Sequence, residues 1–402
     1  MKDSYDIGTK AFSKRLRRHV VGRDRAYFAV TAPGLESLCR EELEAPPMRL
    51  QTQPPGDGGV AFTGRLEDCQ RANLHLRTAS RVLLRIGSIR ASGFGTFEKR
   101  ATDMAWELFL PPAAPVVVKA TMHRCRLLHS EALKERTLAA IARRMQTATG
   151  AARDEHPEAA LPPQTVHIRG YRDRFGFSID SSGAPLYIRG RKPHAGRAPV
   201  RETLAAGILK LMGYAGESPL VDPMCGSGTF SLEAVMAARN IPAGWYREFA
   251  FEHWPSFAPK RWQYLRAEAE REIRSSCPHR IYASDIDPEA CRRLQKTVAG
   301  FGWSDSAIVR KADFFSVEPS VFGDLPGLVV LNPPYGKRVQ TGTQTPAFFR
   351  AVAERLRSTW GGWRAALLAP LPLLQACSLP GFRTVQTVHG GIRLAIHYGR
   401  VP

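Results

Sequence analysis

The second half of the chain predicts an α/β fold with a doubly wound, mostly parallel sheet, because strand and helix patterns alternate along it. Apolar strand patterns lie at 218–225, 279–286, 307–313, 327–334 and 365–370. Helical patterns begin at about residue 200 and recur at 228–240, 288–302 and 345–360. Residues 383–399 hold two more strand patterns, which we expect to close the sheet as an antiparallel hairpin at one edge.

An α+β region at about 27–190 precedes this sheet. Strand patterns lie at 27–32, 116–125 and 166–183, and a hairpin pattern lies at 49–64 with its turn at Pro54 to Gly58. Helical patterns lie at 33–45 and 129–145, and 66–91 begins as a helix and becomes a strand. The region shows no paired carboxylates, metal-ligand cluster or nucleophile–base set, so we interpret it as a binding module. Residues 1–26 are basic and mostly polar, and we expect them to form a flexible arm.

The charge balance favours a polyanionic partner. The 57 Lys and Arg residues exceed the 37 Asp and Glu residues, which gives a formal net charge of +20 at pH 7. A basic excess of this size is typical of proteins that bind nucleic acid, and less often of proteins that bind anionic membranes.

Cysteine usage and hydropathy indicate a reduced, cytoplasmic setting. The seven cysteines are scattered, odd in number and free of CxxC pairs, so neither a zinc site nor a disulfide framework is expected. The sequence shows no secretory signal and no apolar run near the roughly 20 residues that span a bilayer.

A glycine-rich turn follows the first strand of the predicted sheet, in VDPMCGSGTF at 221–230. Glycines let the backbone turn sharply and approach a ligand, and the helix that follows offers free N–H groups and a positive dipole end. The turn lacks the Gly-Lys-Ser/Thr of a P-loop, and it is not GxGxxG. Asp222 at the strand end suits an ammonium group, so a carboxylate-plus-ammonium ligand, such as the methionine end of S-adenosylmethionine, fits this turn.

Two further acids follow strands of the same sheet. Asp285 lies where a carboxylate typically binds both hydroxyls of a ribose, whereas Asp287 precedes Pro288 and is expected to cap the next helix. Asp313 follows the next strand and suits a hydrogen bond from an adenine amino group. Each acid alone is also consistent with a simple cap or turn.

The sequence LNPPY ends the strand pattern at 327–334. An exocyclic NH₂ is a poor nucleophile, because its lone pair is conjugated into the ring of the base. The side-chain oxygen of Asn332 and the carbonyl of Pro333 would accept its two N–H bonds and stabilise the charge that develops on methylation. Pro334 stiffens the loop, and Tyr335 would stack on a base taken out of its helix.

These motifs together resemble a known family. The second half resembles a class I, Rossmann-like S-adenosylmethionine-dependent methyltransferase of the amino-methylating NPPY group. With 189–214, DPMCGSGTF, FAFEHWPSF at 249–257 and NPPYGKR at 332–338, the chain resembles the bacterial 23S rRNA guanine-N2-methyltransferases that carry an N-terminal THUMP domain. That resemblance implies three parts: the arm 1–26, a ferredoxin-like plus THUMP RNA-binding region at 27–190, and a methyltransferase domain at 191–402.

The resemblance also implies roles for individual residues. The catalytic loop would be Asn332, Pro333, Pro334 and Tyr335. The cofactor S-adenosyl-L-methionine would be bound by Asp222, Pro223, Cys225, Gly226, Gly228, Thr229, Asp285 and Asp313, with Glu202 and Thr203 closing over its methionine end. The expected partner is RNA, either 23S rRNA or a ribosome assembly intermediate, and no metal is expected.

Three alternatives stay open. A tRNA guanine-N2-methyltransferase shares the same architecture, and a DNA adenine-N6-methyltransferase shares the NPPY loop. From another class, a non-catalytic RNA-binding assembly factor with a vestigial cofactor fold is possible, although the intact glycine turn, acids and NPPY argue against it.

Overall fold

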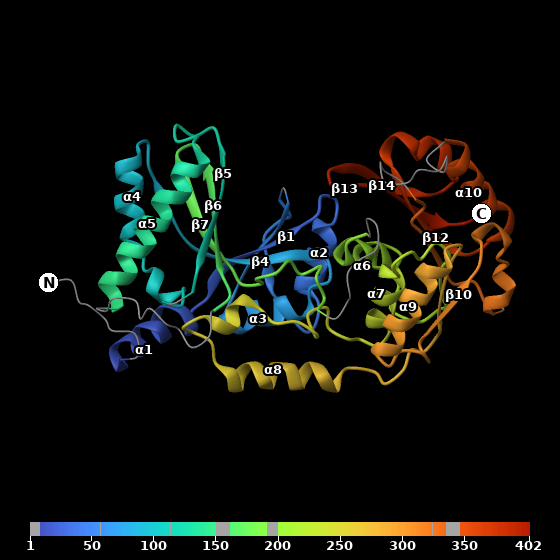
Figure 1. Ribbon diagram of the computed structural model, residues 1–402, viewed down its shortest axis with the longest axis horizontal. Coiled ribbons are helices and arrows are strands. Elements are labelled where there is room, and N and C mark those ends of the chain that lie inside the picture. Colours follow the sequence, from blue (N-terminus) through green and yellow to red (C-terminus); the bar gives the residue numbers. More distant parts are fainter. Residues whose placement is uncertain are drawn as a thin grey trace.

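The computed structural model describes residues 9–56, 58–112, 114–149, 161–190, 200–323, 325–334 and 346–402. Two seven-stranded sheets dominate the molecule, and they lie one after the other along its long axis (Figure 1). Among the helices of the described residues, none is both long and apolar enough to cross a lipid bilayer.

The first sheet has the order β2-β3-β1-β4-β7-β6-β5. Its strands are β1 (Arg25–Thr31), β2 (Gln51–Thr52), β3 (Gly59–Gly64), β4 (Ala79–Arg90), β5 (Val116–His123), β6 (Gln164–Tyr171) and β7 (Arg174–Asp180). The twelve-residue strand β4 pairs with β1 through its first half and with β7 through its second half. This one long strand therefore fuses the predicted α+β region into a single sheet.

Helices cover this sheet in two groups. They are α2 (Glu36–Glu44), α3 (Leu66–His75), α4 (Phe94–Thr102) and α5 (Ser130–Thr149). Phe97 of α4 packs edge-on against Phe175 of β7, with ring centroids 5.2 Å apart. Helix α4 was not expected from the sequence, because it is short and its sequence FGTFEKRAT contains one glycine, two threonines and no long apolar stripe.

The prediction of a flexible arm is wrong for residues 9–25. They form α1 (Lys10–Leu16) and a π-helical turn (Arg17–Val21). Phe12, Leu16 and Val20 recur every four residues on one helical face and are buried in the core of the first sheet. The basic residues between them occupy the exposed face, and these residues dominated the composition on which the prediction relied.

The second sheet has the order β10-β9-β8-β11-β12-β14-β13. Its strands are β8 (Leu220–Asp222), β9 (Ile281–Asp285), β10 (Ala307–Lys311), β11 (Leu328–Leu331), β12 (Arg364–Pro370), β13 (Arg383–His389) and β14 (Ile392–Arg400). The first five strands are parallel, and β14 runs antiparallel to both β12 and β13. The predicted parallel sheet with a closing hairpin is thus confirmed.

Helices lie on both faces of the second sheet. They are α6 (Glu202–Leu211), α7 (Thr229–Ala238), α9 (Pro288–Gly300) and α10 (Pro346–Thr359), whereas α8 (Pro259–Arg271) packs on the first sheet. Apolar residues of α6, α7 and α9 share one buried cluster with the sheet, and those of α10 share a second cluster on the opposite face. Strand order reverses between β8 and β11, so the carboxyl ends of these two strands flank the topological switch point.

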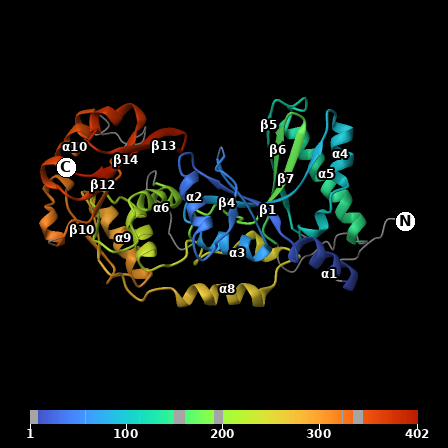
Figure 2. The same cartoon turned by 180° about the vertical axis from the view of Figure 1, so that it is seen from behind.

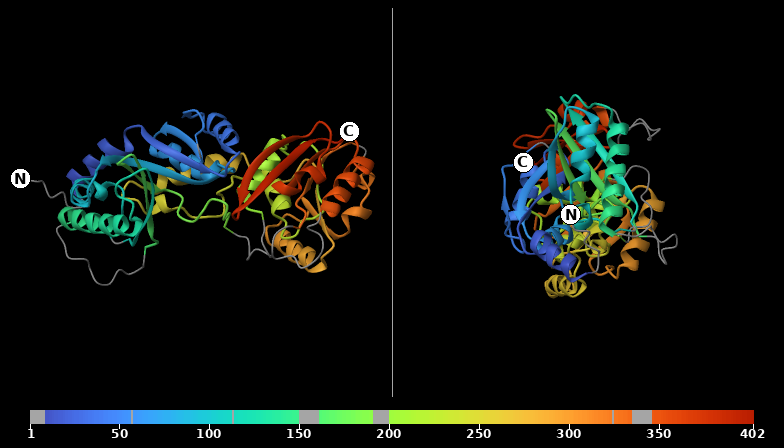
Figure 3. Two further views of the ribbon diagram at one scale, coloured as in Figure 1. Left: turned by 90° about the horizontal axis from the view of Figure 1, so that it is seen from above. Right: turned by 90° about the vertical axis from the view of Figure 1, so that its left-hand side faces the viewer.

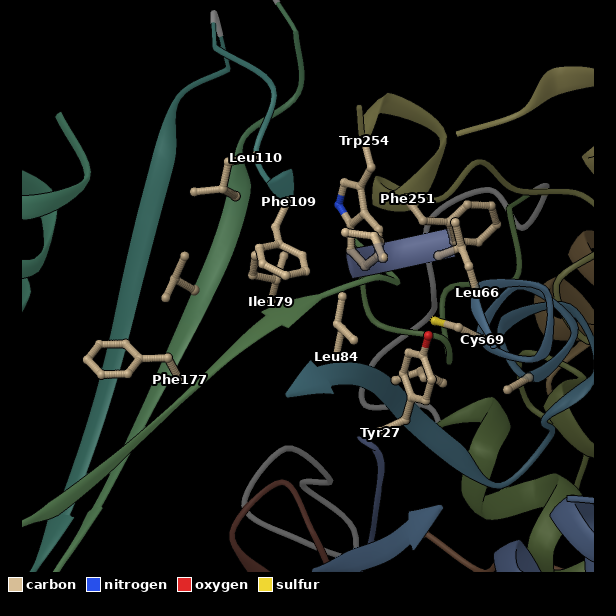
Figure 4. Close-up of a cluster of buried hydrophobic side chains, with 14 of the residues drawn as sticks. Tyr27, Leu66, Cys69, Leu84, Phe109, Leu110, Phe177, Ile179, Phe251 and Trp254 are labelled. Atoms are coloured by element: carbon tan, nitrogen blue, oxygen red, sulfur yellow. The ribbon is translucent and has the colours of Figure 1, made fainter. Parts of the chain in front are cut away.

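An insertion between α7 and β9 joins the two halves. Phe249, Phe251, Trp254 and Trp262 belong to the hydrophobic core of the first sheet, although they lie far along the sequence. Figure 4 shows Phe251 and Trp254 in this core. The indole N–H of Trp254 donates to Oε1 of Gln164 at 3.0 Å inside this core. Helix α8 runs along the first half, close to α3 (Figure 2), and Arg71 of α3 pairs with Glu268 at 3.0 Å.

Buried arginines connect the halves through polar contacts. Arg189 donates to both carboxylate oxygens of Glu233 at 2.9 and 3.1 Å, and these two side chains are only 7% and 2% exposed. The same guanidinium donates to the carbonyl of Arg77, whose own side chain donates to the carbonyls of Met236 and Ile241. Seen from above, the two halves form one elongated body (Figure 3).

Candidate active site

The sequence-predicted residues gather at the carboxyl edge of the second sheet. Asp222 ends β8, Asp285 ends β9, and Asn332 directly follows β11. Because β8 is paired with both β9 and β11, these three strand ends are adjacent. Ligands of open α/β sheets bind at this edge, beside the switch point.

The turn between β8 and α7 depends on two glycines in the left-handed region. Gly226 has φ +50° and Gly228 has φ +75°. A side chain at Gly228 would overlap Leu294 of α9, whereas a Cβ at Gly226 would meet no atom within 4 Å. The turn is therefore packed closely at Gly228 and open at Gly226, so backbone near Gly226 is accessible to a ligand.

Asp222 lies beneath this turn. Its side chain is 0% exposed, and its Oδ2 accepts a hydrogen bond from Ser231 of α7 at 2.7 Å. A direct contact with a ligand ammonium requires the turn to open, and that predicted contact stays a prediction. In the present geometry the carboxylate fixes the start of α7 against the end of β8.

The remaining turn residues are mostly enclosed. Pro223 is buried, and Cys225 is 7% exposed with its N–H donating to the carbonyl of Ser284 at 2.9 Å. Burial raises the pKa of the Cys225 thiol well above its usual value, which favours the neutral thiol over the thiolate. Thr229, the first residue of α7, is 4% exposed.

Asp285 ties two loops together at the end of β9. Its Oδ2 accepts the N–H of Gly226 at 2.8 Å, and its Oδ1 accepts the N–H of Asp287 at 2.9 Å. The neighbouring Asp287 caps α9 by accepting the N–H of Glu289 at 2.9 Å, which confirms the predicted cap. Each oxygen of Asp285 retains a second acceptor position, so the carboxylate can also accept hydrogen bonds from ribose hydroxyls.

Asp313 lies one strand further out, after β10. Its Oδ1 accepts the N–H of Phe315 at 3.1 Å, and it caps the short 3₁₀ turn Phe314–Ser316. Phe315 is 36% exposed, and its ring lies 6.0 Å from that of Phe348. The geometry brings an acid and an exposed ring together here, and the contact with adenine stays a prediction.

Asn332 carries an acceptor oxygen without a donor. Its Oδ1 is shielded from solvent, and no donor among the described residues reaches it. A buried polar atom without a partner costs about 1–3 kcal/mol, and this one lies at the sheet edge where ligands bind, so a ligand donor is a suitable partner for it. Pro333 is buried and Pro334 is half-buried. Tyr335 lies outside the described residues.

The start of α6 reaches the same edge of the sheet. Glu202 and Thr203 are its first two residues, and Thr203 is 4% exposed. Sequence reasoning missed His389 at the tip of the β13–β14 hairpin, whose Nε2 accepts the N–H of Arg201 at 3.2 Å. A lone histidine at a hairpin tip gives no signal in the sequence, because only the closed sheet brings it to α6.

The described residues hold no group of three or more His, Cys, Asp or Glu side chains that could hold a metal ion.

An open sheet of this strand order, with a glycine turn after β8 and an acid after β9, is a Rossmann-like methyltransferase fold. Residues 189–394 match the RMKL-like methyltransferase domain, and residues 26–83 match the RlmL ferredoxin-like domain. The chain belongs to the RMKL-like methyltransferase family.

Curated relatives extend this match beyond one domain. The "Ribosomal RNA large subunit methyltransferase K/L" of Psychromonas ingrahamii is 31% identical over 360 residues, which cover 88% of this chain and 47% of the relative. The chain thus spans about half the length of the K/L relatives that it matches. The "Putative RNA methyltransferase slr0064" of Synechocystis is 30% identical over 345 residues, 85% of this chain and 87% of the relative.

Solved structures share the whole architecture. SMU.472, described as a putative methyltransferase complexed with SAH, has a TM-score of 0.82 at 25% identity, and the match covers 94% of this chain and 99% of that one. A Listeria monocytogenes protein, described as a predicted N6-adenine-specific DNA methylase, also has a TM-score of 0.82 at 25% identity, with 95% and 97% coverage.

Proposed function

We propose that this protein is an S-adenosylmethionine-dependent RNA methyltransferase that methylates the exocyclic N2 amine of a guanosine in 23S rRNA. The family membership and the names of the K/L relatives support this proposal. We further propose that residues 27–190 are mainly the RNA-binding part and that residues 191–402 are the catalytic part. The insertion of 242–275 belongs to the second range by sequence, but it packs onto the RNA-binding part.

The residues present fit the cofactor. The turn is open at Gly226, and the carboxylate of Asp285 already contacts the N–H of this glycine. We infer that Pro223, Cys225, Gly226, Gly228 and Thr229 hold the methionine end, with Asp222, Glu202 and Thr203 beside it. Asp285 would accept the ribose hydroxyls, and Asp313 would accept the adenine amine. S-adenosylmethionine, when bound, supplies an activated methyl group on a sulfonium, and the relative that was crystallised with SAH supports this fit.

The observation that carries the proposal is the unpartnered Oδ1 of Asn332. We infer that Asn332 Oδ1 and the carbonyl of Pro333 accept the two N–H bonds of the target amine. They align its lone pair and stabilise the positive charge that grows on nitrogen. Neither acceptor is a base of suitable strength, so the surplus proton leaves to water after transfer. A flipped base would reach these acceptors with Tyr335 as its stacking partner.

RNA is the substrate that the charge favours. The net charge of +20 supports long-range attraction to phosphates, and THUMP-like contacts would hold structured RNA by shape. The substrate form is either naked 23S rRNA or a ribosome assembly intermediate.

The deciding experiment compares nucleosides from cells with and without this gene by mass spectrometry and maps the modified position in rRNA. Loss of one N2-methylguanosine from 23S rRNA is the expected result. Loss of N2-methylguanosine from tRNA, or of N6-methyladenine from DNA, would identify the alternative substrate instead. If no modified nucleoside changes and purified protein transfers no methyl group to unmodified rRNA, the chain acts without catalysis and the proposal is overturned.

A further inference from the structure

The first sheet has one face that no described helix covers near β5, β6 and β7. Helices α4 and α5 lie against one side of these strands, and the other side is bare in both Figure 1 and Figure 2. Strand register places His123, Tyr171, Arg174 and Arg90 in one row across β5, β6, β7 and β4. All four side chains are exposed. We call this side of β4–β7 the open face.

Positive charge gathers on the open face. Arg169 lies in the next row of this face, Lys119 and Arg85 lie in the row after that, and all three are exposed. They have no acidic partner among the described residues. Burial and the neighbouring Arg169 both lower the pKa of Arg85, which indicates that like charges are held close together. Two acids of this face already have partners: Asp180, which is 0% exposed, pairs with Arg81, and Asp173 at the tip pairs with Arg126.

Acids lie instead on the helical side. Glu98 of α4 pairs with Arg136 and Arg143 of α5, and Glu131 pairs with Lys134 at 2.7 Å. These cations of the helical side therefore have acidic partners, whereas Lys119, Arg169 and Arg85 of the open face have none among the described residues. A segregation of this kind is not explained by the basic composition of the whole chain, and it fits a polyanion on the open face.

An aromatic pair lies at the tip of the open face. The rings of His123 and Tyr171 are parallel within 3° with centroids 5.9 Å apart, and Tyr171 is 47% exposed. The guanidinium of Arg172 lies 5.2 Å from the Tyr171 ring. Exposed rings between guanidinium groups are how single-stranded RNA is held, because unpaired bases stack on them and phosphates bind the cations.

Backbone geometry and a hydrogen bond define the shape of the tip. Arg124, Arg172 and Asp173 have φ values of 54°, 48° and 58°, which are costly for residues other than glycine. Asp173 accepts the N–H of Arg126 at 2.7 Å and so holds the two tip loops together. A fixed platform loses little conformational entropy when it binds.

From this arrangement we propose that the open face binds an unpaired stretch of RNA, with Tyr171 and His123 stacking on a base and Lys119, Arg169 and Arg174 binding phosphates. This inference rests on the proposed function for the identity of the RNA. The open face belongs to the first sheet, whereas Asn332 lies on the second, so it selects and orients the substrate without touching the reacting amine. Duplex RNA would not bind the open face in this way, because its paired bases expose no ring face for stacking.

The stacking is tested with Tyr171→Ala and Tyr171→Phe. Tyr264→Ala is the matched control, because Tyr264 is also 47% exposed and also lies under an arginine, Arg261, at 4.9 Å. We expect Tyr171→Ala to weaken binding to a protein-free large-subunit rRNA transcript by about 5- to 50-fold. Tyr171→Phe and Tyr264→Ala are expected to bind like the wild type. Retained S-adenosylmethionine affinity and melting temperature show that each variant is folded.

The charge is tested with Lys119→Glu against Lys99→Glu, an exposed lysine on helix α4. We expect only Lys119→Glu to reduce the slope of log affinity against log salt, by about 1. A single-stranded oligonucleotide should compete for the open face better than a duplex of equal length.

Two outcomes overturn the inference. One is a Tyr171→Ala variant that binds the transcript as tightly as Tyr264→Ala, and the other is equal competition by duplex and single strand. A wild-type protein that binds the transcript but methylates no RNA overturns the proposed function alone, since the binding comparison still decides the role of the open face.

Discussion

Asn332 combines a buried acceptor oxygen that lacks a donor among the described residues with a position directly after β11, at the carboxyl edge of the second sheet. We expect Asn332→Ala to lower kcat by about 10² or more, since the transition state loses one of two acceptors. Affinity for S-adenosylmethionine should stay near normal, because the cofactor turn follows a different strand. Single-turnover methyl transfer to unmodified rRNA and calorimetric titration of the cofactor measure the two effects.

Asn332→Gln is the informative control for this residue. It keeps the amide but moves it by one methylene, and small displacements of a positioning group are costly in rate. We expect its turnover to be as low as that of Asn332→Ala. If either variant retains wild-type turnover, Asn332 does not act as an acceptor in the reaction.

Asp285 and Asp287 form a natural matched pair, two residues apart on one loop. Asp285 bridges the glycine turn, whereas Asp287 caps α9. Asp285→Ala should weaken S-adenosylmethionine binding by about 10- to 100-fold, because two charge-assisted ribose contacts are lost. Asp287→Ala should instead lower stability by about 1 kcal/mol and leave cofactor affinity unchanged. Cofactor titration together with thermal melting separates the two roles, and equal cofactor affinities would refute the ribose assignment.

At the scale of elements, the β8–α7 turn contains two glycines with unequal surroundings. Gly228→Ala forces a Cβ into the buried Leu294 side chain as well as an unfavourable φ, so Leu294 must repack or the turn must move. Gly226→Ala adds a Cβ in open space and costs only the left-handed backbone, about 1–2 kcal/mol. We expect Gly228→Ala to abolish measurable cofactor binding and to lower the melting temperature more than Gly226→Ala does.

Comparing Gly226→Ala with Gly228→Ala distinguishes a packing role from a ligand-contact role at this turn. A Gly226→Ala variant that melts like the wild type but binds the cofactor poorly would indicate that the added methyl occupies ligand space. Equal melting temperatures for the two variants would contradict the packing role of Gly228.

Elements with strong periodicity were predictable from the sequence, and elements formed by tertiary contacts were not. The parallel strands and α9 follow from apolar runs and a capped start at Asp287. Residues 9–21 show a four-residue apolar repeat, but their basic composition concealed it. The site followed from strand-end motifs, because parallel strands bring their carboxyl ends together. The positions of His389 and of the open face depend on strand register, which the sequence alone does not reveal.

At the scale of the whole molecule, one segment belongs to the second half by sequence but packs in the core of the first half. The insertion that carries Phe251 and Trp254 is read from the sequence as part of the second half, yet it completes the core of the first sheet. Long-range docking of this kind leaves no local signature beyond an unusual density of aromatic residues. The consequence is that the two halves are joined by shared core and by buried polar contacts, so they should unfold together.

Substitutions in the Arg189–Glu233 pair test most directly whether buried polar contacts join the two halves. Arg189→Met leaves the Glu233 carboxylate, only 2% exposed, without its cation, which should cost about 3–5 kcal/mol. The double variant Arg189→Met/Glu233→Leu should recover much of that loss, because no buried charge remains unpaired, although two carbonyls still lose a donor. Arg357→Met breaks an exposed pair with Glu354 and should change stability by less than about 1 kcal/mol.

Urea unfolding followed by tryptophan fluorescence and by far-UV circular dichroism measures all three variants. Coincident transitions are expected for the wild type, and a second transition in Arg189→Met would show that the halves then unfold separately. If Arg189→Met is no less stable than Arg357→Met, the buried pair does not hold the two halves together.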